Sequence, residues 1–273
     1  MFKKIFLLFV FLFTAAIPSY AFNEDITVEN RDGVYIFKIP LKKYKDKIKP
    51  YVADELTTVS DVFKNKDLNF KLVVNGGFFD PVNGAAVSEV TIDEKEVQSL
   101  FSNMSLVQSL DRQGRVEAVL NRTELRVLSD TKDRLSFDIV NHFFIPDINT
   151  IVKHSIQGGP MILPDLRLEE ESFIKYKNNK AISLAADVLK RRERTIIGLK
   201  KGILNNDSLY IIIFTNAHKA ALNEVRDYCL KLKLDKAMAM DGGASTSINY
   251  KDIEIYSAND GQRRVKSFLV IEN

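Results

Sequence analysis

Three segments of this sequence share one pattern, in which an apolar run ends in a polar residue followed by two glycines. They are VVNGGFFDP around Asn75, SIQGGPMIL around Gln157 and MAMDGGASTS around Asp241. A glycine pair interrupts a regular strand because glycine lacks a side chain and adopts turn conformations that other residues avoid. The three segments therefore predict strands with sharply defined ends, in a fold built mainly from sheets.

Further runs along the chain have the composition of strands. Residues 33–40 (GVYIFKIP) alternate apolar and polar side chains, as a half-buried strand does. Residues 207–214 (DSLYIIIF) are apolar nearly throughout, which is typical of a central strand covered on both faces. Between 104 and 140, the runs MSLVQSL, RVEAVL, TELRVL and LSFDIV are separated by turn residues. Their spacing predicts an antiparallel meander.

Two segments are predicted to be helical. Residues 216–234 begin with Asn216, a favourable N-cap, and place Leu222, Val225 and Cys229 at helical spacing. A second helix is expected within 48–64, and a short strand over 235–240. We therefore predict one α+β domain over residues 22–273, with mixed, largely antiparallel sheets and a few packed helices. A division into two lobes stays open. Because ligands gather beyond strand ends in open sheets, a ligand cleft is expected at the glycine-rich strand ends.

Residues 1–21 (MFKKIFLLFVFLFTAAIPSYA) have the layout of a secretory signal peptide, with two lysines, a short apolar run and small residues before Phe22. The apolar run is shorter than the roughly 20 residues of a membrane span, although an uncleaved anchor is the alternative. No later stretch is long and apolar enough to span a membrane. We therefore expect an exported protein, periplasmic or secreted.

The charge balance argues against nucleic acid as a partner. The net charge of +3 falls to +1 when residues 1–21, with Lys3 and Lys4, are removed. A nucleic-acid binder needs a large cationic surface. The single cysteine, Cys229, cannot form an internal disulfide, so an exported chain relies on packing alone. The oligomeric state is not predicted.

The glycine pairs also suggest a ligand site. Successive backbone N–H groups in such turns form anion-binding nests, and the absence of side chains lets a ligand approach. The alternative is three ordinary tight turns. The residues that would line the site are Asn75, Gly76, Gly77, Phe78, Gln157, Gly158, Gly159, Gly242, Gly243, Ser245 and Thr246.

A basic stretch, KRRERTIIG, precedes an apolar strand. Strand alternation puts Arg192 and Arg194 on one face and Arg191 on the other. Arginine suits a bidentate grip on phosphate or carboxylate, whereas a solvated strand end is the alternative.

Carboxylates are the candidates for acid–base chemistry. Asp80 and Asp241 lie inside glycine-rich segments, and a pair of carboxylates can cleave a glycosidic bond. Glu89, Asp187 and Glu193 lie nearby in sequence, so the identity of a pair stays open. The three histidines are scattered without metal-ligand spacing, and Ser245 is not in a hydrolase nucleophile elbow.

In order along residues 73–270, these motifs resemble the phosphodiester glycosidase family. VNGGFFDP, QGGPMIL, RERTIIG, AMAMDGGAST and GQRRVKSFLVI look like five successive family segments. The third carries a family arginine onto Arg194, and the last carries one onto Arg263 or Arg264. Ala244 replaces the usual third glycine, and the loop after Asp80 follows the family pattern only loosely.

The resemblance implies an exported hydrolase that cleaves the bond between a sugar and a phosphodiester, with a carbohydrate or sugar-phosphate substrate. Arg194, the Gly76–Gly77 backbone and the Gly242–Gly243 backbone would hold the phosphate, together with Arg192. Asn75 would orient the substrate, and Asp241, or else Asp80, would transfer a proton or bind a metal. The resemblance identifies no particular cofactor, and a divalent metal is left open. The alternative is a non-catalytic envelope protein that binds glycan or anionic polymer.

Overall fold

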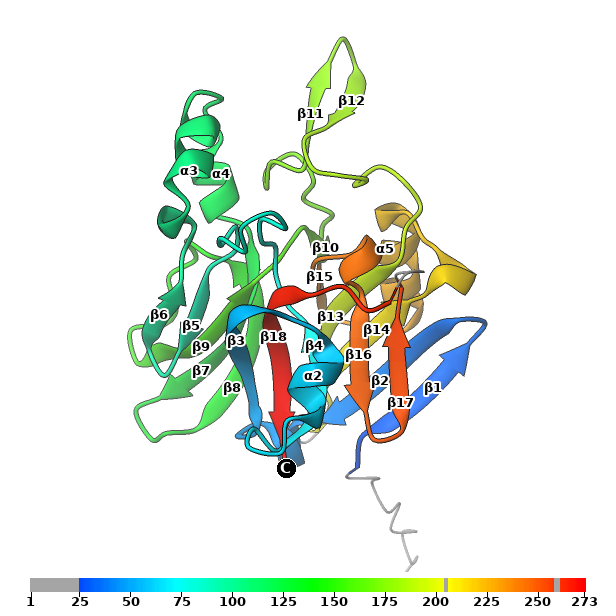
Figure 1. The fold of residues 1–273 in the computed structure, drawn as a ribbon. Coiled ribbons are helices and arrows are strands. Elements are labelled where there is room, and N and C mark those ends of the chain that lie inside the picture. The colour runs from blue at the N-terminus through cyan, green and yellow to red at the C-terminus, as the bar shows by residue number, and fades with distance from the viewer. Residues whose placement is uncertain (1–24, 204–205, 258–260) are drawn as a thin grey trace, which may run out of the picture.

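The computed structural model describes residues 25–203, 206–257 and 261–273, and the proposed signal segment 1–21 lies outside this range. The described strands form three larger sheets and one separate hairpin (Figure 1). All pairs between these strands are antiparallel. The predicted α+β class with mostly antiparallel sheets and few helices is confirmed.

The largest sheet contains the strand predicted to be central. Strand β14 (Ser208–Phe214) is buried along its whole length and pairs on both sides. The sheet order is β1-β2-β14-β13-β15-β10. The other members are β1 (Thr27–Arg31), β2 (Val34–Pro40), β13 (Arg194–Lys200), β15 (Lys236–Ala239) and β10 (Met161–Leu163).

Two five-stranded sheets and a hairpin complete the strands. The first sheet, in spatial order, comprises β17 (Ile253–Tyr256), β16 (Ser247–Tyr250), β4 (Phe70–Asn75), β18 (Val265–Glu272) and β3 (Ile48–Thr57). The second comprises β6 (Lys95–Gln98), β5 (Val90–Ile92), β9 (Thr150–Gln157), β7 (Thr123–Asp130) and β8 (Leu135–Asn141). The hairpin pairs β11 (Ile174–Lys177) with β12 (Lys180–Ser183).

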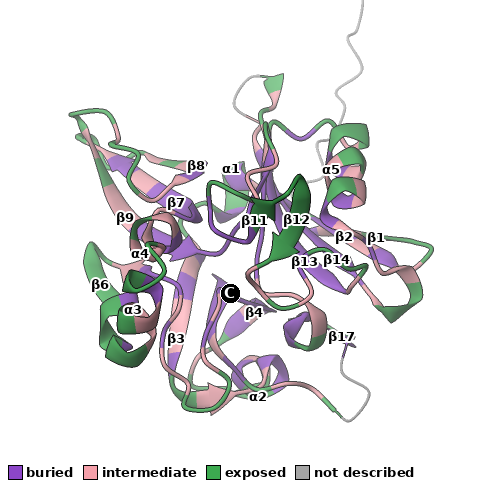
Figure 2. Cartoon of the chain, turned by 90° about the horizontal axis from the view of Figure 1, so that it is seen from above, coloured by how far each residue is buried: buried purple, intermediate pink, exposed green. Residues whose placement is uncertain are grey.

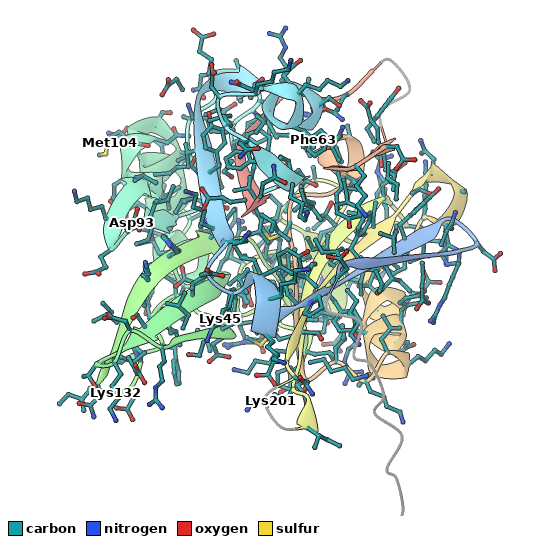
Figure 3. All side chains as sticks on the ribbon, turned by 90° about the horizontal axis from the view of Figure 1, so that it is seen from below. Lys45, Phe63, Asp93, Met104, Lys132 and Lys201 are labelled. Carbon is teal, nitrogen blue, oxygen red and sulfur yellow. The ribbon has the colours of Figure 1, made fainter. Side chains whose placement is uncertain are left out.

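Side chains from all three larger sheets meet in one central core. Ile39 of β2, Val74 of β4, Leu125 of β7 and Ile211 of β14 belong to it. Figure 3 shows the side chains between the sheets, and the labelled Lys45, Lys132 and Lys201 are exposed to solvent. Burial of this apolar surface is the main stabilising contribution to the fold.

Two short helices cover outer sheet faces. Helix α5 (Leu222–Lys231) packs Val225 and Cys229 with the outer face of the six-stranded sheet, and α2 (Val59–Lys64) packs against the sheet that contains β4. These layers explain why strands such as β14 are apolar on both faces. The remaining helices are α1 (Leu41–Tyr44), α3 (Met104–Asp111) and α4 (Val116–Leu120).

The structure corrects three sequence predictions. Residues 104–120 form α3 and α4 rather than strands, because Asn103 caps the N–H of Leu106 and Leu110 packs with Val119 in a small separate cluster. The predicted helix over 48–64 is wrong over its first part. That part is β3, an edge strand that tolerates Pro50, and only residues 59–64 are helical.

The third correction concerns the start of α5. Asn216 belongs to a separate 3₁₀ turn, and its side-chain amide donates to the carbonyl of Ser257. The helix begins at Leu222, where Glu224 reaches back to accept the N–H of Ala221 at 2.8 Å. Among the described residues, none of the helices has the length and apolar character needed to cross a membrane.

Candidate active site

The three glycine pairs predicted from the sequence meet where strands from all three larger sheets end. The N–H of Asp241 donates to the carbonyl of Gly76 at 3.1 Å, and the N–H of Gly159 donates to that of Ala239 at 2.8 Å. A Cβ atom added at Gly77 would lie 2.1 Å from the carbonyl oxygen of Gln157. Gly76, Gly77 and Gly158 are thus needed because a Cβ atom at each would clash with the backbone of a crossing strand end.

The glycine N–H groups are mostly occupied within the protein. Gly76 donates to the carbonyl of Ser267 at 2.8 Å, and Gly77 donates to the hydroxyl of the same residue at 3.2 Å. Gly158 donates to Thr123, and Gly243 donates to Glu193 at 2.9 Å. These groups therefore form no open anion-binding nest, contrary to the sequence-based expectation.

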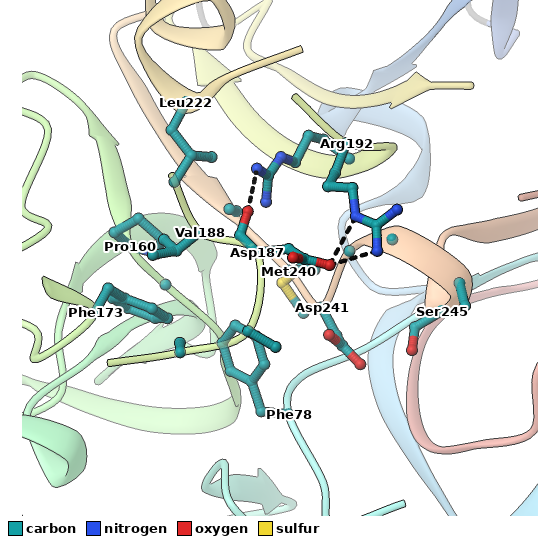
Figure 4. A pocket seen from close by; sticks show the side chains of 18 of the residues that line it. Phe78, Pro160, Phe173, Asp187, Val188, Arg192, Leu222, Met240, Asp241 and Ser245 are labelled. Carbon is teal, nitrogen blue, oxygen red and sulfur yellow. Dashed lines mark hydrogen bonds and ion pairs between the residues drawn. The ribbon is translucent and has the colours of Figure 1, made fainter. Parts of the chain in front are cut away.

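A pocket of about 330 Å³ lies beside this crossing (Figure 4). In the close-up, Phe173 and Pro160 lie on one side and Ser245 on the other, with Asp241 between them. The pocket brings together a part of the predicted site from distant segments of the chain. The predicted residues that line it are Phe78, Gly159, Arg192, Arg194, Asp241, Gly242, Gly243 and Ser245.

Asp241 follows β15, and the buried Asn75 fixes its backbone. The side-chain amide of Asn75 donates to the backbone carbonyl of Asp241 at 2.7 Å. Burial raises the pKa of the Asp241 carboxyl to about 6. A hydrogen bond from Ser245, the charge of Arg263 and the N–H of Gly242 limit this rise. The carboxyl can therefore exchange a proton near neutral pH.

Arg194 begins β13 and is 8% exposed. Its Nε and Nη2 atoms donate to backbone carbonyls of Ala220, Asp187 and Lys190, which fix the guanidinium in place. Among the described residues, no hydrogen-bond acceptor is found for Nη1. Burial lowers the pKa of Arg194 to about 10, so the side chain stays cationic at neutral pH.

Arg192 lies beside Arg194 and is held by an acid. Its Nε donates to a carboxylate oxygen of Asp187 at 2.8 Å, and Nη2 contacts the same oxygen. The other carboxylate oxygen of Asp187 pairs with Lys190 at 2.7 Å. Hydrogen bonds from Lys190 and Arg192 lower the pKa of the Asp187 carboxyl. Asp187 is thus an ionised group that orients Arg192 toward the pocket.

A third arginine, Arg263, also lines the pocket. The sequence left Arg263 and Arg264 as alternatives. The structure places Arg263 at the pocket with its guanidinium 6.0 Å from the ring centre of Phe79, whereas Arg264 is exposed to solvent. The pocket therefore gathers three arginines and two carboxyl groups, of which Asp187 is paired with Arg192 and Asp241 is not part of an ion pair among the described residues.

The wall of the pocket on the side away from Ser245 is aromatic. The rings of Phe78 and Phe173 lie 5.6 Å apart, and the buried guanidinium of Arg122 lies 4.1 Å from the ring centre of Phe173. Glu171 fixes the loop before Phe173, because its carboxylate accepts the hydroxyl of Thr123 at 2.6 Å and the N–H of Met161 at 2.9 Å. Sequence reasoning missed Phe173, since no motif marks it and only the returning loop brings it to the pocket.

Comparison with known families decides what this chain is. The family model described as phosphodiester glycosidase matches residues 69–272. The chain belongs to the phosphodiester glycosidase family. Each of the predicted motifs lies within this matched range. No curated protein sequence matches the chain closely enough to count as a relative.

Solved structures resemble this family member in fold. The catalytic domain of zebrafish N-acetylglucosamine-1-phosphodiester alpha-N-acetylglucosaminidase, auto-inhibited by its pro-peptide, matches with a TM-score of 0.59 at 13% identity, over 91% of this chain and 82% of that chain. A Synechocystis protein matches with 0.58 at 12%, over 90% and 61%. A protein of Burkholderia pseudomallei named a putative exported protein matches with 0.57 at 11%, over 88% and 74%. At these identities the likeness concerns the fold.

Several predicted site residues of this family member lie behind the pocket. Asn75 is fully buried, and its side-chain oxygen accepts hydrogen bonds from the hydroxyl of Thr195 and the N–H of Ser247. Gln157 is also fully buried, and its amide donates to the carbonyl of Leu120 at 2.7 Å. These side chains hold strands together and are not among the residues that line the pocket.

The remaining predicted site residues also do not line the pocket. The Asp80 carboxylate accepts the N–H of Val82 at 2.9 Å and closes a turn, and Asp80 does not line the pocket although its neighbours Phe79 and Pro81 do. Thr246 is buried, and its hydroxyl has no partner among the described residues. Gly76, Gly77 and Gly158 form the strand crossing. The described residues contain no group of three or more His, Cys, Asp or Glu side chains placed to hold a metal ion.

Proposed function

We propose that the protein hydrolyses the glycosidic bond between a sugar and a phosphodiester. Membership of the family supports this reaction class. The single observation that carries the proposal is the Asp241 carboxyl, whose pKa is about 6, in the same pocket as Arg192, Arg194 and Arg263. The Asp241 carboxyl can exchange a proton at the glycosidic bond that breaks, while the neighbouring arginines bind the phosphate attached to that bond.

The arginines bind the phosphate and stabilise it as the leaving group. Arg192 and Arg194 are fixed by hydrogen bonds before a ligand arrives, so little reorganisation is needed as negative charge develops. A phosphate monoester has a second pKa of about 6, so it leaves as an anion without needing a proton. Asp241, whose pKa is about 6, is then enough for the proton chemistry, and Asp187 stays ionised beside Arg192.

Asp241, in its ionised form, acts as the general base. It accepts a proton from water while the water oxygen bonds to the anomeric carbon. The bond between that carbon and the phosphate oxygen breaks, and its electron pair stays with the phosphate. The products are a free sugar and a phosphate monoester. General-base catalysis typically contributes about 10²- to 10⁴-fold to the rate.

The aromatic wall accommodates the sugar. Phe78 and Phe173 present apolar ring surface on the side of the pocket away from Ser245. Apolar walls with a few placed polar groups are typical of small-molecule sites. The apolar face of a pyranose ring would pack here, which directs its anomeric carbon toward Asp241 and its phosphate toward the arginines.

The test uses a sugar-1-phosphodiester and an aryl glycoside of the same sugar. We expect the wild type to hydrolyse the phosphodiester in preference, and Asp241→Asn to lower kcat by about 100-fold or more. Asp252→Asn, at an exposed turn, is the matched control and should retain wild-type turnover. Failure of the wild type to cleave either substrate, with Asp241→Asn binding them equally well, would favour the non-catalytic binding protein.

The same proposal includes export, with the periplasm or the medium as the site of action. The pattern of residues 1–21 supports it, as does the fold shared with a protein named a putative exported protein. Fractionation of cells that express the full chain, followed by N-terminal sequencing of the mature protein, tests both export and cleavage after Ala21. Retention of residues 1–21 in a membrane fraction would contradict cleavage.

A further inference from the structure

The hairpin β11–β12 rises directly from the rim of the candidate site. Phe173, which precedes β11, and Ala185, which follows β12, both line the pocket. The two stems are joined where the N–H of Leu184 donates to the carbonyl of Phe173 at 2.8 Å. From Lys175 to Ser183 every residue is exposed, and the hairpin projects away from the sheets (Figures 1 and 2).

The residues just before the hairpin are fixed by hydrogen bonds, although residues 175–183 of the hairpin itself are exposed to solvent. The Glu171 carboxylate accepts hydrogen bonds from Thr123 and Met161 inside the protein. Arg115 donates to the hydroxyl of Ser172 at 2.7 Å and to its carbonyl at 3.0 Å. The paired strands of the hairpin bury almost no apolar surface, and an isolated two-stranded hairpin is marginally stable at best in water. Packing therefore gives no reason for its length.

The charged side chains of the hairpin, residues 174–183, are all positive. Its sequence, IKYKNNKAIS, contains Lys175, Lys177 and Lys180 and no acid. Lys177 pairs with Lys180 across the strands, and Lys175 pairs with Ile182. Paired residues share a face, and residues two apart along a strand share it as well, so all three lysines lie on one face. No carboxylate among the described residues forms an ion pair with any of them.

We propose that this hairpin is a binding arm for an anionic glycan polymer whose terminal unit occupies the pocket. The inference rests on the proposed function and names its substrate class, a polymer of sugars linked by phosphodiesters. A ligand that extends out of the pocket past Phe173 meets the hairpin next, because the pocket wall continues into its stem. The lysine face then binds phosphates of the following units through charge attraction that salt weakens.

The test compares two triple variants with the same change in net charge. Lys175→Ser/Lys177→Ser/Lys180→Ser removes the charges of the arm. Lys45→Ser/Lys132→Ser/Lys201→Ser removes three exposed lysines elsewhere on the molecule, as Figure 3 shows. Each is assayed on a sugar-1-phosphate methyl ester, which ends inside the pocket, and on a purified poly(sugar-1-phosphate) of the same sugar.

We expect the arm variant to cleave the methyl ester like the wild type but to lose about 10- to 100-fold in kcat/KM on the polymer, from three lost surface charges. Its polymer hydrolysis should also depend less on salt than that of the wild type. The distant variant should behave like the wild type on both substrates. An equal loss on the polymer in both triple variants, or none in the arm variant, would overturn the inference.

A binding measurement tests the role of the hairpin lysines even if the protein does not hydrolyse the polymer. Polymer affinity is measured by sedimentation for Asp241→Asn, with and without the three lysines of the arm. Loss of affinity with the lysines supports the arm, whereas equal affinity overturns it. Tighter binding of anionic phospholipid vesicles than of the polymer would also overturn it, since the partner would then be a lipid surface. If the wild type cleaves neither substrate, the proposed function alone is contradicted.

Discussion

The side-chain amide of Asn75 donates a hydrogen bond to the backbone carbonyl of Asp241 at 2.7 Å, which ties the end of β4 to the end of β15. The amide oxygen of the same residue accepts the hydroxyl of Thr195 at 2.7 Å and the N–H of Ser247 at 3.1 Å. One buried side chain therefore connects strands of two sheets next to Asp241, the candidate general base.

Asn75→Ala should lower both stability and activity. The substitution leaves buried donors on Thr195 and Ser247 and the carbonyl of Asp241 without this partner. Each unsatisfied group costs about 1–3 kcal/mol, so a loss of roughly 3 kcal/mol or more in the free energy of unfolding is expected. Urea denaturation measures it, and kcat falls because the Asp241 backbone is no longer fixed.

Thr195→Val separates the two effects. It removes one hydrogen bond of Asn75 and keeps the bond to Asp241, so a smaller loss of about 1 kcal/mol and near wild-type kcat are expected. If Thr195→Val lowers kcat as much as Asn75→Ala does, the bond to Asp241 is not what couples Asn75 to catalysis.

The role of Asp241 as a base predicts the direction of the pH dependence. The rate of phosphodiester cleavage should rise with pH through about 6, where the carboxyl ionises, and then reach a plateau. The plateau should extend toward pH 9, because the pKa of Arg194 is about 10. Removal of the hydroxyl in Ser245→Ala should move the rising limb to higher pH, since this hydrogen bond favours the ionised carboxyl. A rate that falls through pH 6 would make Asp241 a proton donor instead.

Asp241 should also make the folded protein less stable as pH rises. Its pKa is raised from 3.8 to about 6 in the folded state, so the folded state binds the proton more tightly than the unfolded state does. The resulting stability is fully present below pH 3.8 and is lost as pH rises through about 6. Two pKa units correspond to about 3 kcal/mol, and exposure to the pocket reduces this to about 1–2 kcal/mol.

Asp241→Asn is therefore expected to be more stable than the wild type at pH 8 and similar to it at low pH. Thermal unfolding of both proteins between pH 4 and pH 8 measures the difference. Asp252→Asn, which changes an exposed acid, should show no such divergence. A gap between wild type and Asp241→Asn that stays constant with pH would mean that burial of the charge is not its source.

The sequence was informative where one segment carries the whole signal. The apolar run of β14 and the alternation in β2 indicated their burial, because strand periodicity is a local property. The short runs of α3 and α4 misled, since a few apolar residues fit either period until the cap at Asn103 is considered. Lys49 was a local sign against a helix that starts near residue 48, because the residue before a proline avoids the helical conformation.

The site was only partly predictable, for a physical reason. Asp241 and Arg194 lie at strand ends inside recognisable motifs, which was reason to expect them in one cleft, and both line the pocket. Phe173 and Arg263 reach the pocket on returning segments, and the sequence does not specify which way such segments fold back. Burial separated Asn75 from the ligand side, and only a three-dimensional structure gives that information.

All the glycine pairs were predicted to approach a ligand, but Gly76, Gly77 and Gly158 approach backbone atoms and do not line the pocket, which leads to a last prediction. In Gly77→Ala the new methyl group would lie 2.1 Å from the carbonyl oxygen of Gln157, a backbone atom that cannot rotate away. The strand ends must separate, which costs roughly 3 kcal/mol in the free energy of unfolding. Phe78 follows directly and lines the pocket, so KM should rise as well.

Gly114→Ala is the control for the backbone conformation alone. Gly114 has φ +63°, and a Cβ atom there would meet no atom within 4 Å. Its cost should be about 1 kcal/mol, because left-handed strain of 1–2 kcal/mol is partly offset by the stiffer unfolded chain. Chemical denaturation of the two variants should therefore show a clearly larger loss for Gly77→Ala. Equal losses would mean that the strand crossing relaxes around a methyl group, and that close backbone contact is not the reason for glycine at this position.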